Sequence, residues 1–517
     1  AEQAVIIKRP NKHKVAFNIR LIYIFILSKV SQKLGYFLKS SSDFYLNLNF
    51  IIALKKKFRY RAQIYFCEEL NMIKHVTSVD QSDRKVPYNL RQSGSTPVQM
   101  LISTRVRKSP YWHLSMRAGC WRATVYNRVY HPRGYVKPED GGAMVEYEAI
   151  KNHVTMWNVA VERQIQVKGP DAEAFVDYVI TRDASKISPM RARYVILCNH
   201  YGGVLNDPIL LRLTKDEFWF SLSDSDISFY LQGVNHDKRF NVEIDEIDVA
   251  PVQIQGPKSL ALMKDLIGDQ VELDNMPFYG LAEAKVGGRN CVISQSGFSG
   301  EAGYEIYLRD ATLYADDMWN AVLEAGKKHN LMVIAPAHHR RIQAGILSWG
   351  QDMDNQHNPF QCNLGYQVSL SGKGEWNKTS DYVGKEVLEK MKSGLQAGQK
   401  PYKLQLVGLS LGGKPIEEYA PDFWLISPAE GGEPCGYITS PWYHPEQGRN
   451  IAMGYVPFDG TLSNNGFPIG KVGTKYKVHL PDQYSDTPGV PVDAEVVPVP
   501  FTESFNANTR EVSGANK

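Results

Sequence analysis

The chain has 517 residues, of which 43% are hydrophobic and 22% are charged, with 41 Gly and 28 Pro. This composition is globular and excludes collagen-like, coiled-coil and mainly disordered proteins, while the length predicts about three domains. The formal net charge of +4 is too small for this length to indicate nucleic-acid binding. The chain also lacks a run of about 18 apolar residues that would predict a membrane span.

Residues 1–71 differ in composition from the rest of the chain. They hold 13 Lys and Arg against 4 Asp and Glu, whereas the remainder holds 46 basic and 51 acidic residues. Three interpretations are a targeting extension, a surface-binding tail, and upstream sequence that is not part of the natural protein. Lys predominates over Arg, unlike in a mitochondrial presequence, and Met72 stands where the composition becomes ordinary. We therefore favour the third interpretation, with Met72 as the expected true start, and expect residues 1–71 to be a basic extension outside the folded enzyme.

The six cysteines are widely spaced and form no CxxC pair. A zinc site or a disulfide framework is therefore not expected, and reduced thiols in the core of a cytoplasmic protein are the favoured interpretation.

An internal repeat is visible between residues 164 and 267. Gly169-Pro170 and Gly256-Pro257 each follow a strand-like run and precede an amphipathic helical pattern, at 171–180 and 258–267. Proline suits the first helical position because no N–H donor is needed there. Strand-like runs follow each repeat, and together they predict two related α+β halves within residues 72–370; these runs are 209–213, 218–222, 290–294 and 304–308.

The C-terminal region has a different pattern. Residues 402–517 lack long helical periodicity and contain short β-type runs between Gly and Pro, which predicts a small β-barrel or sandwich. Residues 371–401 read as a linker between this domain and the preceding halves. The predicted strands of the C-terminal domain are 403–411, 451–457, 475–480 and 494–501.

Two motifs place carboxylates where a ligand could be bound. Asp207 follows a Gly-Gly turn and opens a strand; by itself it is better explained as a turn residue that bonds its own backbone. The run 296–307 is more specific, because three glycines in seven residues allow close backbone approach before an alternating strand. Glu305 in that strand could accept two hydrogen bonds from an amidine-like ring edge, although an exposed Glu in a hairpin is the alternative.

The segment 336–350 is predicted to be a helix that carries Arg341, and it is followed by a polar, turn-rich loop of the kind that often lines a site. His338 and His339 are adjacent rather than four residues apart, so they cannot chelate from one helix face. No metal site is predicted here.

These segments together resemble the folate-binding aminomethyltransferase family, whose type member is the T-protein of the glycine cleavage system. The order and spacing of the motifs match over about residues 120–515. Within the family the sequence is more similar to the dimethylsulfoniopropionate (DMSP) demethylase branch. The likeness to the family as a whole is carried by VLND at 204–207, GFSGEAGYEIY at 297–307 and GQDMD at 350–354. The likeness to the demethylase branch is carried by TVYN at 124–127, WNVAVERQIQVKGPDAEAFV at 157–176, RDASK at 182–186, LNDPILLRL at 205–213, SDSDISFY at 223–230 and DNQHNPFQC at 354–362.

The resemblance implies an α+β, three-domain, cloverleaf-like fold with two related halves and a C-terminal barrel-like domain. It implies tetrahydrofolate in a central channel, with Asp207 near the reacting folate nitrogen and Glu305 on the pterin edge. The other residues that it places around the folate are Tyr307, Arg341 and Tyr194.

The sequence departs from the glycine-cleavage member at two positions, where Val161 replaces a histidine and Ala337 begins the counterpart of an ARD motif. Both departures favour a demethylase over transfer from a lipoyl carrier. A sulfonium methyl group needs no metal and no covalent nucleophile, but the cation must be bound, and aromatic faces do this. Tyr126 and Phe298 are the expected substrate residues because they lie inside matching motifs.

Three functional hypotheses follow. The first is a tetrahydrofolate-dependent demethylase that converts DMSP to 3-(methylthio)propanoate and forms 5-methyltetrahydrofolate. The second is a related O- or N-demethylase or aminomethyltransferase with another donor, where an ether donor would need a proton donor such as Tyr. The third is a non-enzymatic folate-binding module, which the presence of both Asp207 and Glu305 disfavours. We expect small-molecule partners only, with no nucleic acid and no membrane.

Overall fold

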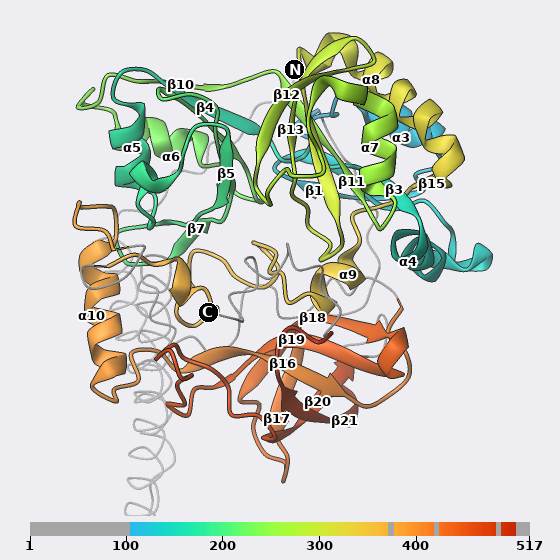
Figure 1. Ribbon diagram of the computed structural model, residues 1–517. Coiled ribbons are helices and arrows are strands. Elements are labelled where there is room, and N and C mark those ends of the chain that lie inside the picture. Colours follow the sequence, from blue (N-terminus) through green and yellow to red (C-terminus); the bar gives the residue numbers. More distant parts are fainter. Residues whose placement is uncertain (1–103, 371–376, 418–422, 482–487, 503–517) are drawn as a thin grey trace, which may run out of the picture. The chain divides into compact units, whose positions relative to one another are not determined.

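The computed structural model describes residues 104–370, 377–417, 423–481 and 488–502. The basic extension predicted at 1–71 lies outside the described residues. Within them the chain forms two mixed helix-and-sheet bodies and a closed β-barrel (Figure 1), which confirms the predicted α+β class. No helix among these residues is long and apolar enough to cross a bilayer.

The described chain begins with a short helix and a β-hairpin. Helix α3 (Trp112–Arg117) precedes strands β1 (Arg122–Tyr126) and β2 (Val129–Gly134), which pair in antiparallel fashion. Asn127 and Arg128 form the turn with positive φ angles, a conformation that Asn tolerates well. Helix α4 (Gly142–Asn152) follows.

The first sheet has five strands in the order β10-β4-β9-β8-β5, and its core is built around Phe175, Phe218 and Phe220. Helices α5 (Ala172–Val179) and α6 (Ser228–Val234) belong to this half. Its strands are β4 (Gln164–Lys168), β5 (Arg191–Tyr194), β8 (Ile209–Arg212), β9 (Glu217–Ser221) and β10 (Glu243–Glu246), and a small separate pair is formed by β6 (Leu197–Cys198) and β7 (Val204–Asn206).

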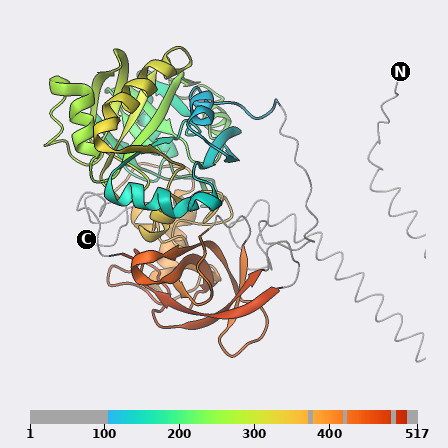
Figure 2. The ribbon, with the colours of Figure 1, turned by 90° about the vertical axis from the view of Figure 1, so that its right-hand side faces the viewer.

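The second sheet has six strands in the order β12-β13-β14-β11-β3-β15, and only the β15–β3 pair is parallel among its described ladders. Helices α7 (Ser259–Ile267) and α8 (Ala311–Gly326) pack together against one face of this sheet (Figure 2). Its strands are β3 (Val154–Asn158), β11 (Val249–Gln255), β12 (Leu281–Val286), β13 (Arg289–Ser294), β14 (Gly303–Arg309) and β15 (Leu331–Val333).

The Gly-Pro repeat marks equivalent turns in the two halves. Gly169 follows β4 with φ +145°, and Gly256 follows β11 with φ +127°. A Cβ atom at these positions would lie 2.5 Å from the Asn241 carbonyl oxygen and 2.6 Å from the His153 carbonyl oxygen. Only glycine allows this close backbone approach. The prolines precede the first helical residue by two positions, so they lie just before the helices and not at their first position.

The helix predicted over 336–350 is shorter than expected. Helix α9 spans only His338–Gln343, because Gly345 takes φ +70° and ends it. The Gly345 N–H donates to the Ile342 carbonyl at 2.9 Å, and the Ile346 N–H donates to the Arg341 carbonyl at 2.8 Å. This pair of bonds is the Schellman arrangement, which satisfies the last carbonyls of a helix.

The expected linker 371–401 contains a helix, which corrects that prediction. Helix α10 (Lys385–Gln396) places Leu388 and Leu395 in an apolar cluster that also contains barrel residues such as Leu406 and Tyr455. These residues are seven apart and therefore lie on one helix face. Residues 371–376 lie outside the described part of the chain.

The C-terminal domain is a closed barrel with the order β16-β19-β18-β17-β20-β21, which confirms the barrel alternative of the prediction. Val407, Ile438 and Val478 belong to its apolar core. The barrel strands are β16 (Leu404–Leu411), β17 (Trp424–Pro428), β18 (Gly436–His444), β19 (Arg449–Pro457), β20 (Lys475–Pro481) and β21 (Pro488–Val497). Single-turn 3-10 helices lie at Pro138–Asp140, Ala184–Lys186, Gly268–Gln270, Lys327–His329, Gly365–Gln367 and Pro445–Gln447.

Candidate functional site

A cavity of about 500 Å³ is lined by residues of the β1–β2 hairpin, both sheets and the barrel. This volume lies in the range of small-molecule sites. Five of the seven residues predicted for the site line it, and they come from positions up to 179 residues apart in the chain: Tyr126, Tyr194, Asp207, Phe298 and Glu305.

Glu305 is held rigidly in the cavity wall. It lies on β14, is 3% exposed, and accepts hydrogen bonds from Gln253 at 2.8 Å and Ser296 at 3.0 Å. The Tyr307 hydroxyl donates to the same carboxylate at 2.6 Å. Burial raises the pKa of Glu305, and these three donors oppose the shift. A carboxylate offers about four acceptor positions, so it can accept one further bond from a ligand.

The glycines around Glu305 make room for a protein side chain. A Cβ atom at Gly297 would lie 2.1 Å from the Gln255 amide, and one at Gly303 would lie 2.3 Å from it. The Gln255 side chain in turn contacts Ser296 and Ser299. The close approach predicted from the three glycines therefore exists, and at these two positions its partner is Gln255.

Asp207 follows β7 and is 6% exposed. Its Oδ2 accepts a hydrogen bond from the Tyr194 hydroxyl, with 2.9 Å between the two oxygens. Its Oδ1 has no hydrogen-bond partner among the described residues. Burial raises the pKa of Asp207 to about 7, although the Ser223 and Tyr194 hydroxyls oppose the shift. A buried acceptor without a partner is costly, so Oδ1 is available to a donor on a ligand.

Glu162 is a third carboxylate in the cavity wall, and the sequence motifs did not single it out. Its Oε2 accepts the Ser221 hydroxyl proton at 3.1 Å. Burial raises its pKa well above the ordinary value, and the neighbouring charges of Glu305 and Asp207 add to the rise. In this poorly solvated site, the negative charges of Glu305 and Asp207 therefore disfavour ionisation of Glu162.

The two aromatic residues predicted to bind the substrate come from different segments of the chain. Tyr126 ends β1, and its ring lies 5.3 Å from the ring of His131 at an angle of 40°. Phe298 lies in the loop before β14 and packs on the cluster that contains Trp157. Both rings line the same cavity as the three carboxylates.

Tyr307 and Arg341 are buried and are not among the described lining residues. Tyr307 acts on the cavity through its bond to Glu305. Arg341 on α9 pairs with Asp352 at 2.5 Å and donates to Ser440 of β18 at 2.8 Å. Asp352 also accepts the Thr439 hydroxyl proton at 2.6 Å, so this pair connects the helix to the barrel.

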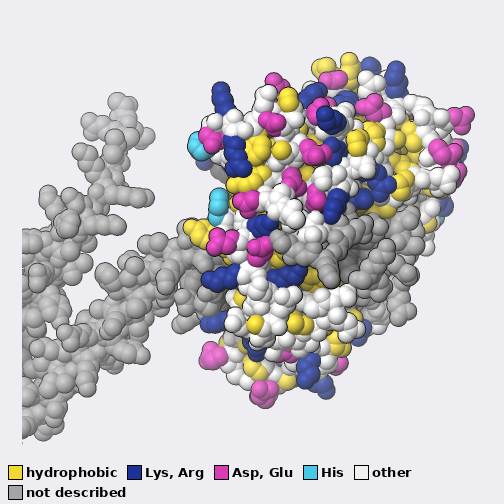
Figure 3. Space-filling view, turned by 60° about the vertical axis from the view of Figure 1, so that its left-hand side comes forward, with side chains coloured by type: hydrophobic (Ala, Val, Ile, Leu, Met, Phe, Trp, Pro, Cys, Tyr) yellow, Lys and Arg dark blue, Asp and Glu magenta, His cyan; other side chains and the backbone are white. Residues whose placement is uncertain are grey.

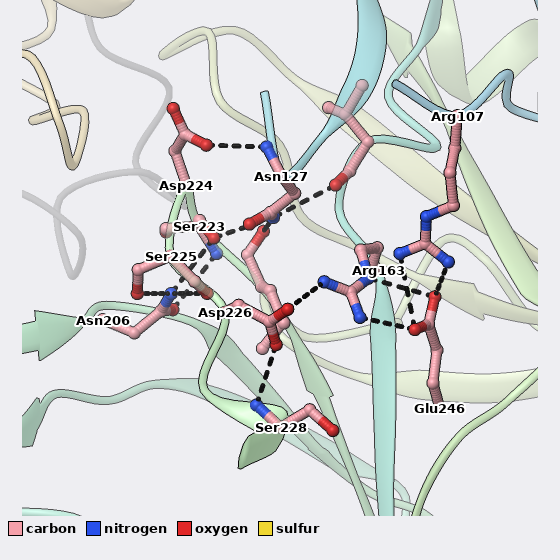
Figure 4. Close-up of polar contacts among 12 residues, drawn as sticks. Arg107, Asn127, Arg163, Asn206, Ser223, Asp224, Ser225, Asp226, Ser228 and Glu246 are labelled. Atoms are coloured by element: carbon pink, nitrogen blue, oxygen red, sulfur yellow. Dashed lines mark hydrogen bonds and ion pairs between the residues drawn. The ribbon is translucent and has the colours of Figure 1, made fainter. Parts of the chain in front are cut away.

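A polar loop that contains residues 223–226 makes hydrogen bonds with Asn127 and Asn206 (Figure 4). The Asn127 N–H donates to Asp224 at 2.6 Å, and the Asn127 amide donates to the Ser223 carbonyl at 2.8 Å. Asn206 contacts the same loop through Ser223 and Ser225, with the Ser225 hydroxyl at 2.8 Å. Since Asn127 follows Tyr126 and Asn206 precedes Asp207, the loop positions both site residues.

Lining residues that the sequence reasoning missed include Glu162, Arg133, His131 and His338. Glu162 follows Val161, the position already noted as a departure from the glycine-cleavage pattern, so that departure was a usable signal. Arg133 and His131 carry no motif of their own, and only the folded hairpin brings them to the cavity that Tyr126 lines. The described residues contain no group of three or more His, Cys, Asp and Glu that could hold a metal ion.

Comparison with known proteins agrees with this geometry. The GCVT N-terminal domain family matches residues 112–372. The chain belongs to this aminomethyltransferase family. The prediction made from the sequence motifs is therefore confirmed, and the assignment supports tetrahydrofolate as the one-carbon acceptor.

The chain aligns with most of the length of two curated relatives. The chain is 32% identical to the dimethylsulfoniopropionate demethylase DmdA of Ruegeria pomeroyi over 356 residues, which is 68% of this chain and 90% of that protein. It is 30% identical to an aminomethyltransferase of Thermotoga maritima, covering 63% of this chain and 85% of the relative. The crystal structure of the glycine cleavage system aminomethyltransferase T from Bartonella henselae aligns with a TM-score of 0.63 and 21% identity, covering 78% of this chain and all of that one. That likeness shows the shared fold.

Proposed function

We propose that the protein is a tetrahydrofolate-dependent methyltransferase that demethylates DMSP to 3-(methylthio)propanoate. The observation that carries the proposal is the unpartnered Asp207 Oδ1 in a cavity that also contains Glu305 and two aromatic rings. The 32% identity to a DMSP demethylase over 90% of its length supports DMSP as the donor.

The donor set fits a reduced pterin. The carboxylates of Asp207 and Glu305 are acceptors, and a reduced pterin presents N–H donors along its ring edge. Glu305 is held in one orientation by its three protein donors, so it binds that edge without reorganisation. When bound, tetrahydrofolate supplies the amine nitrogen that accepts the methyl group and releases a proton.

Asp207 is suited to accept that proton. A carboxylate with a pKa of about 7 is a competent general base near neutral pH. Tyr194 fixes the carboxylate through Oδ2 and leaves Oδ1 directed to the ligand. The sulfur–carbon electron pair stays on sulfur, which leaves as a neutral thioether, so the donor side needs no acid.

Tyr126 and Phe298 bind the sulfonium. A ring face attracts a cation with ~0.5–2 kcal/mol, and it does not neutralise the positive charge as a carboxylate contact would. Removal from water strengthens this attraction. The residues of the chain therefore orient the donor and exclude water, while the electrophile is already activated.

Glu305→Gln and Asp207→Asn separate the two roles. We expect Glu305→Gln to weaken tetrahydrofolate binding by ~10- to 100-fold, since it removes charge-assisted acceptance in a buried site. Asp207→Asn should retain most of the binding and lose turnover. Calorimetric titration measures the first effect, and the rate of 5-methyltetrahydrofolate formation measures the second.

Glu283→Gln is the matched control, because Glu283 is an exposed carboxylate of the same sheet and does not line the cavity. It should behave as the unaltered protein does. Unchanged turnover in Asp207→Asn would contradict the catalytic role of Asp207, and unchanged folate affinity in Glu305→Gln would contradict the pterin site.

A further inference from the structure

Three polar side chains of the β1–β2 hairpin line the cavity. Tyr126 pairs with Val129, and Thr124 pairs with His131. Tyr126, His131 and Arg133 all line the cavity. Arg133 lies where the register of the hairpin shifts, between the Pro132–Ala123 and Gly134–Arg122 pairs. Arg133 is half-buried there.

Arg133 is the single Arg or Lys among the described residues that line the cavity. Burial lowers the pKa of both lining histidines, His131 and His338, well below the ordinary value, so they are neutral at pH 7. The acidic lining groups are Glu162, Asp207 and Glu305. The cavity therefore contains a guanidinium on the hairpin in addition to its three carboxyl groups.

Burial raises the pKa of Asp224, and the nearby positive charge of Arg133 opposes this rise. The Asp224 carboxylate already accepts the Asn127 N–H at 2.6 Å. A structural role for Arg133, in which it compensates Asp224, is therefore the competing explanation, and the experiment has to distinguish the two.

We propose that Arg133 binds a carboxylate of the methyl donor and so selects donors that carry an anionic group. This inference rests on the proposed function and names the substrate class for it. A guanidinium matches a carboxylate with two parallel N–H···O bonds, which gives both affinity and orientation. The hairpin then holds both ends of a zwitterionic donor, with Tyr126 at the cation and Arg133 at the anion.

Tetrahydrofolate also carries carboxylates, on its glutamate. The donor is favoured as the partner because Arg133 and Tyr126 line the cavity from the same hairpin, whereas the proposed folate acceptors come from other elements. Asp207 follows β7 and Glu305 lies on β14.

The test measures binding of two ligand pairs to the full chain in the presence of tetrahydrofolate. The first pair is DMSP and ethyldimethylsulfonium, and the second is 3-methoxybenzoate and methoxybenzene, so each pair differs in the carboxylate. The variants are Arg133→Gln, Arg133→Lys and the control Arg128→Gln. Arg128 is an exposed arginine in the turn of the same hairpin and does not line the cavity.

In at least one pair the unaltered protein should bind the carboxylated member ~10- to 100-fold more tightly, as a charge-assisted hydrogen bond supplies. Arg133→Gln should abolish this preference, Arg133→Lys should retain part of it, and Arg128→Gln should leave it unchanged. Three results would overturn the proposal. They are no preference for a carboxylate in the unaltered protein, a preference that survives in Arg133→Gln, and an equal loss of affinity for both members of a pair in Arg133→Gln.

The alternative that Arg133 binds the glutamate of tetrahydrofolate is tested separately. Binding is measured for tetrahydrofolate and for 6-methyltetrahydropterin, which lacks the glutamate. Equal effects of Arg133→Gln on these two ligands support the donor as the partner, whereas a loss confined to tetrahydrofolate would assign Arg133 to folate. These readouts are affinities. Failure of DMSP as a methyl donor in turnover would therefore be recognised separately from failure of the Arg133 assignment.

Discussion

The Asp207 carboxyl group links the geometry of the site to its chemistry. Its pKa is raised to about 7 because the group is buried, whereas the unfolded chain has the ordinary value near 3.8. Between these values the folded protein binds a proton that the unfolded chain does not. Rising pH therefore removes stability through this group, and the loss is complete above pH 7.

Asp207→Asn should remove this pH dependence. Relative to the variant, the unaltered protein should lose up to ~1.4 kcal/mol of unfolding free energy per pH unit between about pH 4 and 7. Urea unfolding of both proteins at pH 5 and pH 8 measures the difference. A constant difference across this range would show that Asp207 titrates as an ordinary exposed carboxyl.

At the scale of elements, the Gly-Pro repeat is a structural device that carries no site residue. Both repeat glycines have φ angles that side chains rarely adopt, and both lie against a backbone carbonyl. This explains why the repeat could be recognised from sequence: the same backbone approach is needed where each strand delivers its helix.

Gly256→Ala should destabilise the protein more than Gly288→Ala. Both positions have positive φ, but a Cβ at Gly256 would meet the His153 carbonyl oxygen at 2.6 Å, whereas one at Gly288 meets nothing within 4 Å. We expect about 1 kcal/mol for Gly288→Ala and several kcal/mol for Gly256→Ala. Denaturant midpoints measure both, and equal losses would contradict the steric explanation.

The local sequence pattern predicted an element correctly where the periodicity of apolar residues matches their burial in the structure. The strands β8, β9, β13, β14, β16, β19 and β20 were predicted with small errors at their ends, because alternation and β-branched residues define them. The helix at 336–350 was overestimated because the termination at Gly345 depends on its φ angle. Strands β17 and β18 were not predicted, and helix α10 was mistaken for a linker.

At the scale of the whole molecule, the site depends on segments that are distant in the chain. Motifs identified Asp207 and Glu305, and the structure places both in one cavity. Arg133 could not be predicted, because the role proposed for it follows from its place in the cavity wall and from the absence of another lining cation among the described residues. On the face shown in Figure 3, basic and acidic side chains of the described residues are interspersed, which agrees with a small-molecule site as the focus of function.

Methyl transfer from DMSP to tetrahydrofolate is the reaction proposed for this protein. The most direct measurement incubates the purified full chain with both compounds under anaerobic conditions and quantifies 5-methyltetrahydrofolate and 3-(methylthio)propanoate by chromatography. The proposal predicts equal amounts of the two products, and neither product with Asp207→Asn. No product from a chain that binds tetrahydrofolate, or thioether without methylated folate, would contradict it.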